Sequence, residues 1–376
     1  MPRTLNTQHS TLKIQHSKFD MDERIIRVAI TQGDTNGIGY ETIFKCFAEP
    51  ASLELCTPII YGSPKVAAYH RKALNMQANF SIVPSAAAAQ DGKINLIAAF
   101  EGEVKVELGA RTPESGAAAK QALDKAIADF ATGQYDALVT MPMDVADLDG
   151  ASSQADYIAR ALGVTDDCMQ VFANDSLRIA TATPACPVGA AAVLISKESV
   201  EGKAKALFQC LKRDFRVNNP RLAVLAYNPQ ASTEENEAIA PAVEQLKTDK
   251  VWCYGPFQAD DFFSQCQHEH FDGILAMYHE QAMIPFKMLT GEGGCTFTTG
   301  LDVPVVEPAF LGKTEVGSAD ELPLRIAIYQ AVDAARNRAN YDEPMANPLK
   351  KYYHEKRDES EKVRFAIPKK HEGEGK

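Results

Sequence analysis

The chain has 376 residues, which is enough for one large or two ordinary domains with a sizeable core. Its net charge of -11 argues against binding to nucleic acid or to an anionic membrane surface. There is no apolar run long enough to predict a membrane span, and the eight cysteines form no CxxC pair. These features indicate a globular cytoplasmic protein with reduced thiols.

The first twenty residues carry Ser, Thr, Gln and His without apolar periodicity, and they lack the apolar stretch of a secretory signal. We expect residues 1–20 to be a disordered extension before a natural start at Met21. The two histidines in it, His9 and His16, are therefore poor ligand candidates. At the other end, residues 351–376 form a charged tail.

The first predicted strand, 25–31, runs into the glycine-rich stretch Gly33-Asp34-Thr35-Asn36-Gly37-Ile38-Gly39, and a helix is expected over 41–47. A strand, a glycine-rich turn and a helix can hold an anion on backbone N–H groups at the helix N-terminus. The same residues also suit a plain tight turn between strand and helix. The sequence leaves both interpretations open.

The following elements alternate between short apolar runs and helical patterns. Further strands are expected at 57–61, 80–83, 94–98, 137–141, 177–183, 191–196, 221–226, 251–254, 273–277 and 303–306. Helices are expected at 63–74, 115–132, 157–162, 200–215, 234–246 and 322–336, with loops at 144–153 and 290–299. This alternation predicts an α/β fold with a largely parallel, doubly wound sheet.

The stretch from 271 to 287 has the most chemical content. An apolar run that predicts a buried strand is followed by His279 and Glu280, and Lys287 comes after one more apolar turn. Open α/β sheets bind ligands outside the carboxyl ends of their strands, so these three side chains are candidate catalytic residues. The alternative is a helix N-terminus with a capping glutamate and a solvated lysine, which the spacing fits equally well.

Two stretches resemble a known family. The Tyr-His-Glu-Gln sequence at 278–281, with Pro285 and Lys287, resembles the Tyr-His-Asp-Gln…Pro…Lys segment of 4-hydroxythreonine-4-phosphate dehydrogenases. The turn at 33–41 resembles their Gly-Asp-Pro-x-Gly-Ile-Gly-x-Glu opening. The resemblance extends from about residue 26 to residue 336 and covers most of the chain.

The fold implied is that of the isocitrate/isopropylmalate dehydrogenase superfamily, with two doubly wound α/β domains, a cleft between them and a homodimer. The first domain would comprise 21–150 plus 300–350, and the second 151–299. The implied activity is NAD-dependent oxidation and decarboxylation of 4-phosphooxy-threonine, a small phosphorylated substrate, in pyridoxal phosphate biosynthesis. It needs a divalent metal, zinc, magnesium or cobalt, as a Lewis acid on the alcohol oxygen.

The family holds that metal with three histidines, and the resemblance places one of them at His279. Gln230 and Ala185 stand at the other two positions, in Asn-Pro-Gln and Thr-Pro-Ala contexts. A neutral amide is a weak substitute for imidazole, and alanine offers no ligand atom. Cys186, one residue further on, could supply a thiolate only if its side chain points differently.

Other family positions also carry different residues here. Gln154 and Ala155 replace a substrate-binding His-Thr pair, and Thr296 replaces a substrate-binding asparagine, whereas Lys287 is kept. The substrate-binding arginine aligns near Val305. The loop that binds the cofactor's adenosine end is replaced by 307–311, so no cofactor-binding residue can be assigned.

Two functions follow. The chain is either a working dehydrogenase of this family or a paralogue that keeps the fold, has lost metal-dependent oxidation, and serves as a small-molecule-binding or regulatory protein. A different reaction that uses His279, Glu280 and Lys287 without metal is a third possibility.

Overall fold

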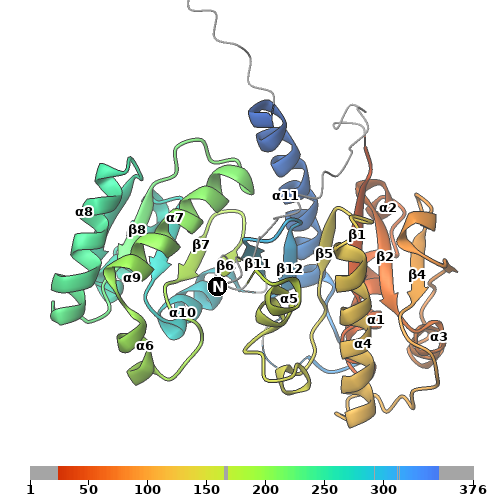
Figure 1. Cartoon of the computed structure of the whole chain (residues 1–376). Coiled ribbons are helices and arrows are strands. Elements are labelled where there is room, and N and C mark those ends of the chain that lie inside the picture. The colour runs from red at the N-terminus through yellow and green to blue at the C-terminus, as the bar shows by residue number, and fades with distance from the viewer. Residues whose placement is uncertain (1–23, 165–167, 292, 311, 313, 347–376) are drawn as a thin grey trace, which may run out of the picture.

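The computed structural model describes residues 24–164, 168–291, 293–310, 312 and 314–346 (Figure 1). The expectations for residues 1–20 and 351–376 lie outside these ranges. The described chain forms one continuous 12-stranded sheet, in the order β3-β4-β2-β1-β5-β12-β11-β6-β7-β10-β8-β9. The sheet crosses both predicted domains, whose boundaries stay a prediction.

The strands are β1 Ile26–Thr31, β2 Cys56–Gly62, β3 Phe80–Ile82, β4 Ile94–Ala98, β5 Ala137–Val139, β6 Met169–Ala173, β7 Arg178–Thr181, β8 Leu222–Leu225, β9 Cys253–Phe257, β10 Gly273–Ala276, β11 Cys295–Thr299 and β12 Val305–Pro308. The α-helices are α1 Gly39–Cys46, α2 Ser52–Leu55, α3 Pro64–Ala73, α4 Pro113–Phe130, α5 Gln154–Leu162, α6 Val188–Leu194, α7 Lys197–Arg213, α8 Ala240–Thr248, α9 Ala259–Ser264, α10 His279–Thr290 and α11 Leu322–Ala346. Short 3-10 helices lie at Ala86–Ala88, Val145–Asp147 and Gln267–His270, and a π-helix at Glu234–Ile239 leads into α8.

Most strand pairs are parallel, as the alternating pattern predicts. The strands from β3 to β12 pair in parallel with their neighbours, and so do those from β7 to β9. Antiparallel pairing occurs only at the centre of this sheet, between β12 and β11, β11 and β6, and β6 and β7. The predicted doubly wound α/β fold is confirmed.

Local sequence explains where the helices begin. The Thr112 side chain accepts a hydrogen bond from the Ser115 backbone N–H, and Ser196 does the same for Ser199, so α4 and α7 each begin with a capping box. Helix α5 is capped by Ser153 and ends at Gly163, whose φ of 71° suits a residue without a Cβ.

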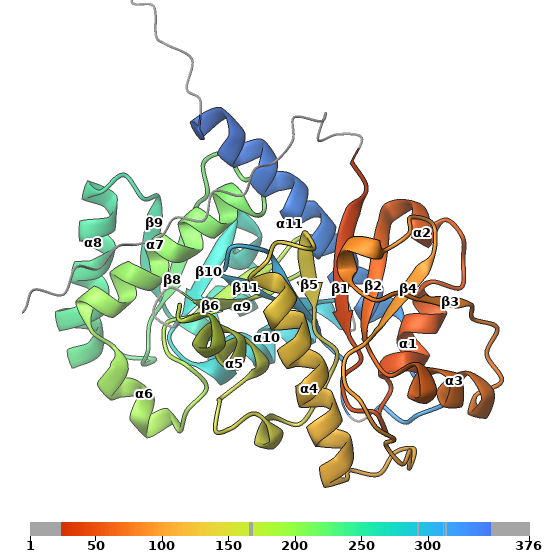
Figure 2. The same ribbon diagram turned by 45° about the vertical axis from the view of Figure 1, so that its right-hand side comes forward.

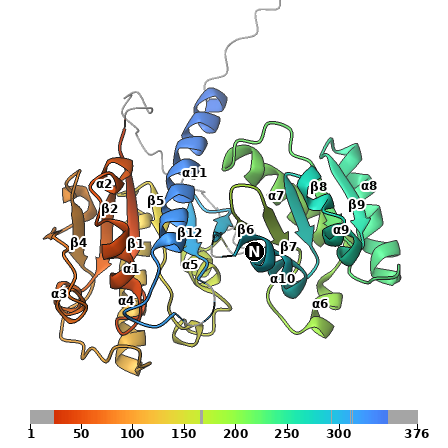
Figure 3. The same ribbon diagram turned by 180° about the vertical axis from the view of Figure 1, so that it is seen from behind.

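The two faces of the sheet are packed differently. On one face a single apolar core runs from β4 to β9 under α1, α3, α11, α7 and α8. In the front and rear views α11 stands between the two halves of the molecule (Figures 1 and 3). On the opposite face the core is divided into one cluster under α4 and α5, which lie on the near side in Figure 2, and another under α9 and α10.

Two element predictions are wrong. The stretch 191–196 was expected to be a strand, but Val188–Leu194 is helix α6, because its run of alanines favours a helix. The stretch 290–299 was expected to be a loop, but Cys295–Thr299 is the central strand β11. Its threonines are β-branched and suit a strand once two neighbouring strands bond to it. Strand β6 was not anticipated.

Candidate functional site

Between the two clusters of the divided face, the sheet presents polar side chains. Thr296 of β11 lies directly opposite Phe172 of β6 and Glu307 of β12. Residues that are directly opposite in antiparallel strands point to the same face, so these three form a row across the sheet. Thr296 and Glu307 are each the partly accessible residue of an otherwise buried strand. We define the candidate site as this row together with the first residues of α5 and α10.

Gln154, the first residue of α5, closes one side of the site. Its side chain is buried, with 3% of the residue exposed. The Nε2 atom donates hydrogen bonds to the Met141 carbonyl at 3.3 Å and to Oε1 of Glu307 at 3.2 Å. The Oε1 atom of Gln154 is buried without a hydrogen-bond partner. Ala155 packs in the core beside it and offers no polar atom.

Glu307 is the acidic group of the site. Burial raises the pKa of its carboxyl to about 7, and the hydrogen bond from Gln154 offsets part of that rise. Among the described residues, no lysine or arginine forms an ion pair with it. A carboxyl group with a pKa near neutrality can hold or release a proton at physiological pH.

His279 closes the other side of the site. It is the first residue of α10, and its ring meets the Phe172 ring edge-on at 5.9 Å. The Gln281 side chain accepts a hydrogen bond from Met277 N at 2.7 Å and donates one to the Ala226 carbonyl at 2.8 Å. These bonds fix the start of α10 against the end of β8.

The segments that carry Ala185 and Gln230 follow β7 and β8, the two parallel neighbours of β10. All three segments therefore leave the sheet at one edge. The Tyr227 hydroxyl donates to the Val188 carbonyl at 2.8 Å, and the Tyr227 and Tyr278 rings pack at 5.6 Å. The expected grouping of these segments around His279 is consistent with this geometry.

Glu235, in the π-helix, organises the loop that carries Gln230. Its carboxylate accepts hydrogen bonds from the backbone N–H groups of Tyr227, Asn228 and Ser232 at 2.7–2.9 Å. Burial alone would raise the pKa of Glu235, but these bonds outweigh it and lower the pKa to about 2. The loop is thus held by a side chain that is ionised at neutral pH.

The donor atoms do not fit a catalytic divalent metal. Ala185 and Gln230 are both exposed, and His279 is the single imidazole at the three positions. Within the described ranges, no group of three or more His, Cys, Asp or Glu side chains could hold a metal ion. Catalytic zinc takes three protein ligands, so the metal implied by the resemblance has too few here.

The other predicted catalytic residues, Glu280 and Lys287, lie exposed on α10. The structure gathers Gln154 and Thr296 around Glu307, with His279 one aromatic ring away. Sequence reasoning missed Glu307 as a site residue, because it assigned 307–311 to a cofactor loop and looked for the lost arginine near Val305. Val305 is only 2% exposed and packs in the core. The available signal was a single carboxylate at the end of an apolar strand.

The glycine-rich turn is a packed tight turn. Gly33 has a φ of 68°, and a Cβ on Gly39 would lie 1.9 Å from the Gln32 carbonyl oxygen. The backbone N–H groups of Asp34, Asn36 and Gly37 donate to the Pro142 carbonyl, the Asp34 side chain and the Asp34 carbonyl. These three donors are therefore used within the protein, which favours the tight-turn interpretation over an anion site.

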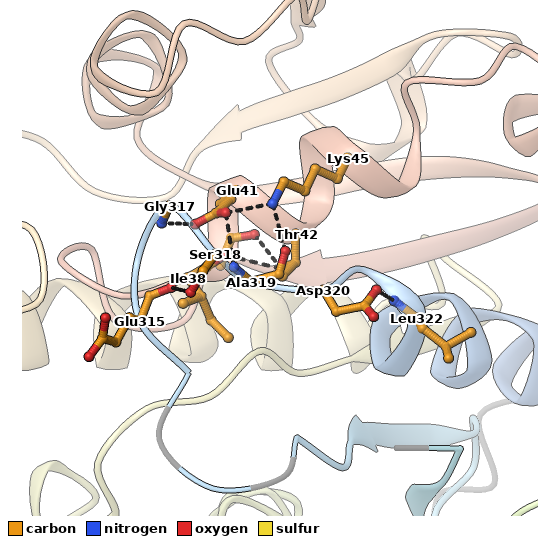
Figure 4. A network of polar contacts seen from close by, with 11 residues as sticks. Ile38, Glu41, Thr42, Lys45, Glu315, Gly317, Ser318, Ala319, Asp320 and Leu322 are labelled. Carbon is orange, nitrogen blue, oxygen red and sulfur yellow. Dashed lines mark hydrogen bonds and ion pairs between the residues drawn. The ribbon is translucent and has the colours of Figure 1, made fainter. Parts of the chain in front are cut away.

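Glu41, just after this turn, binds the segment before α11 (Figure 4). Its buried carboxylate accepts hydrogen bonds from the backbone N–H groups of Gly317 at 2.7 Å and Ala319 at 3.1 Å. Lys45 donates to Glu41 at 2.7 Å and to the Ala319 carbonyl at 2.6 Å. The network fixes the approach to α11 and has a structural role.

The fold and the site define an α/β protein with a candidate small-molecule site where two groups of parallel strands meet. Residues 54–331 match the family described as pyridoxal phosphate biosynthetic protein PdxA. The chain belongs to this family. In the described part of the chain, no helix combines the length and apolar character needed to cross a bilayer.

Relatives support the assignment. The chain is 43% identical to a 4-hydroxythreonine-4-phosphate dehydrogenase of Bacteroides thetaiotaomicron, over 92% of this chain and 98% of the relative. It is 31% identical to the enzyme of that name from Prosthecochloris aestuarii, over 74% of this chain and 88% of the relative. A crystal structure of a Burkholderia phymatum 4-hydroxythreonine-4-phosphate dehydrogenase superimposes with a TM-score of 0.68 at 25% identity, covering 83% and 98% of the two chains.

Proposed function

We propose that this protein binds a small molecule in the candidate site and does not carry out metal-dependent oxidation. It is, in this proposal, a paralogue of 4-hydroxythreonine-4-phosphate dehydrogenase that keeps the scaffold and acts as a binding or regulatory protein. The observation that carries the proposal is the single imidazole of His279, with Gln230 and Ala185 at the other two ligand positions. Without the Lewis acid, hydride loss from a secondary alcohol lacks its main electrostatic support.

The second candidate is the family reaction itself, NAD-dependent oxidation and decarboxylation of 4-phosphooxy-threonine in pyridoxal phosphate biosynthesis. It is favoured by the 43% identity to a relative of that name over almost the whole of both chains. His279 and Lys287 are the residues that it would retain, and NAD and a divalent metal are the cofactors that it would need.

An absorbance assay at 340 nm separates the two candidates. The full chain is given 4-phosphooxy-threonine and NAD with added zinc, magnesium, manganese or cobalt, and the Bacteroides thetaiotaomicron relative is assayed in parallel as the positive control. We expect NADH formation by the relative and none above background by this protein. A turnover in the usual enzyme range of about 1–10³ per second would overturn the proposal and establish the second candidate.

A further inference from the structure

We propose that Gln154 and Glu307 select a hydrogen-bond-donating group of the ligand, an ammonium or a hydroxyl, and exclude a phosphate from this end of the site. The inference rests on the proposed small-molecule binding and specifies the chemical class of the ligand. In the described part of the chain, no basic side chain pairs with Glu307 at this end of the site.

The directions of the hydrogen bonds around Gln154 favour a donor group on the ligand. The Nε2 atom of Gln154 is shared by two acceptors, the Met141 carbonyl at 3.3 Å and Glu307 Oε1 at 3.2 Å. This fixes the orientation of the amide, because a flipped amide would direct its oxygen at the Met141 carbonyl oxygen, which cannot donate. Gln154 Oε1 is consequently a buried acceptor without a donor. A ligand that supplies an N–H or O–H group here would satisfy it.

The charge of Glu307 disfavours a phosphate at this end of the site. A phosphate monoester at neutral pH carries a charge of about -1.5 to -2 and mainly accepts hydrogen bonds. Next to Gln154 Oε1 and Glu307 it would meet two further acceptors, one of them acidic, beside a side chain that is itself buried. Like charges repel more strongly there than in bulk solvent. An ammonium group brings three donors and the opposite charge.

The ionisation of Glu307 is consistent with this selection. Burial holds the pKa of its carboxyl near 7 in the free protein, and a bound cation would favour the charged form and form a charge-assisted hydrogen bond. The row on the sheet also places Thr296 directly beside Glu307, so its hydroxyl can contact the same ligand. By resemblance the family's arginine aligns near Val305, two residues away, whereas the accessible side chain of β12, Glu307, is acidic.

The test compares three probes on one carbon skeleton that lacks an α-amino group: 4-amino-3-hydroxybutanoate, 3,4-dihydroxybutanoate and 3-hydroxy-4-phosphooxybutanoate. Binding to the full chain is measured by titration calorimetry at pH 8. We expect the amine to bind at least tenfold more tightly than the phosphate, with the hydroxyl compound between them. Glu307→Gln should reduce the ratio of amine to phosphate affinity at least tenfold, and Glu307→Asp should keep the order. The exposed Glu269→Gln is the matched control and should leave all three affinities unchanged.

Circular dichroism melting of each variant shows whether it is folded before titration, and Glu307→Asp supplies a second variant if Glu307→Gln is not. The proposal is overturned if the phosphate binds the wild-type chain more tightly than the amine. It is also overturned if the preference survives in Glu307→Gln, or if none of the probes binds at millimolar concentration. These outcomes are independent of the NADH assay, so failure of this inference is distinguishable from failure of the proposed loss of oxidation.

Discussion

Arg338 of α11 and Asp214 at the end of α7 form an ion pair with 2.5 Å between Nε and Oδ1, and their side chains are only 6% and 2% exposed. The same guanidinium donates to the Leu301 carbonyl at 2.8 Å, and Asn337 donates to the Asp214 carbonyl at 2.8 Å. The pair therefore joins the helix that packs on β12, β5 and β1 to the helix that packs on β10.

Asp214→Ala should destabilise the protein by about 3–5 kcal/mol, because it leaves the buried Arg338 charge without a partner. The double variant Asp214→Leu/Arg338→Met should lose much less, since it removes both charges. Urea unfolding followed by circular dichroism measures the difference. Glu103→Gln, which breaks the exposed pair with Lys65, is the control and should not move the midpoint. Equal effects of Asp214→Ala and Glu103→Gln would contradict the prediction.

Glu307 should make stability fall as the pH rises. Burial raises its pKa from 4.5 to about 7, so between these values the folded protein binds a proton that the unfolded chain has released. The stabilisation is complete below pH 4.5 and is lost as the pH rises through about 7, at a final cost on the order of 3 kcal/mol. Glu307→Gln should therefore gain stability relative to wild type at pH 8.5 and much less at pH 5.

The measurement for Glu307 is the difference in unfolding free energy between variant and wild type across that pH range. Thr298→Ser is the control, because it alters a buried polar side chain of the same sheet face without removing a titratable group. Its difference should be independent of pH. If the difference in unfolding free energy between Glu307→Gln and wild type is also independent of pH, the Glu307 carboxyl is well solvated and the prediction is wrong.

The protein should bind zinc poorly, and elemental analysis after desalting should find well under one zinc per chain. Ala185→His together with Gln230→His should raise the content towards one, because three imidazoles then surround the expected metal position. This variant should still form little NADH, since the substrate positions at Gln154 and Ala155 are unchanged. When His279→Ala is added to this double variant, the zinc content should return to the wild-type level. Stoichiometric zinc in the wild-type chain, lost on mutating His279, would refute the ligand assignment.

A homodimer is expected from the family resemblance, and α10 offers an apolar surface for it. Ile284, Met288 and Leu289 are 59%, 81% and 51% exposed on its outer side. Light scattering should give twice the chain mass of 41.0 kDa, and Met288→Glu should shift the mass towards one chain. Ile82→Glu, at a 64% exposed position on the edge strand β3, should keep the dimer. A wild-type mass of one chain would exclude the dimer.

The sequence alone predicts those βα units whose strands and helices are determined by neighbouring residues. The β-branched run in β1 and the Ser or Thr caps of α3, α4 and α7 determine those elements within a few residues. Strands β6 and β11 were not predicted. Each pairs with the next strand of the chain, β7 or β12, but they also pair with each other, and that contact joins segments that are distant in the sequence.

The candidate site was predictable only in part. Gln154, Thr296 and His279 were identified from their motif positions, and the structure gathers the first two around Glu307. Glu307 itself was missed, because its importance depends on facing Gln154, which lies 153 positions away in the chain. The degree of burial that raises its pKa is a property of the packed sheet and cannot be inferred from the neighbouring residues.

The uninterrupted core beneath α11 has a mechanical consequence. Strands β12, β11, β6 and β7 are joined by backbone hydrogen bonds across the middle of the molecule. A hinge between the two halves would have to bend this ladder and the continuous apolar layer that covers one of its faces. We therefore expect heat to melt both halves in one cooperative transition.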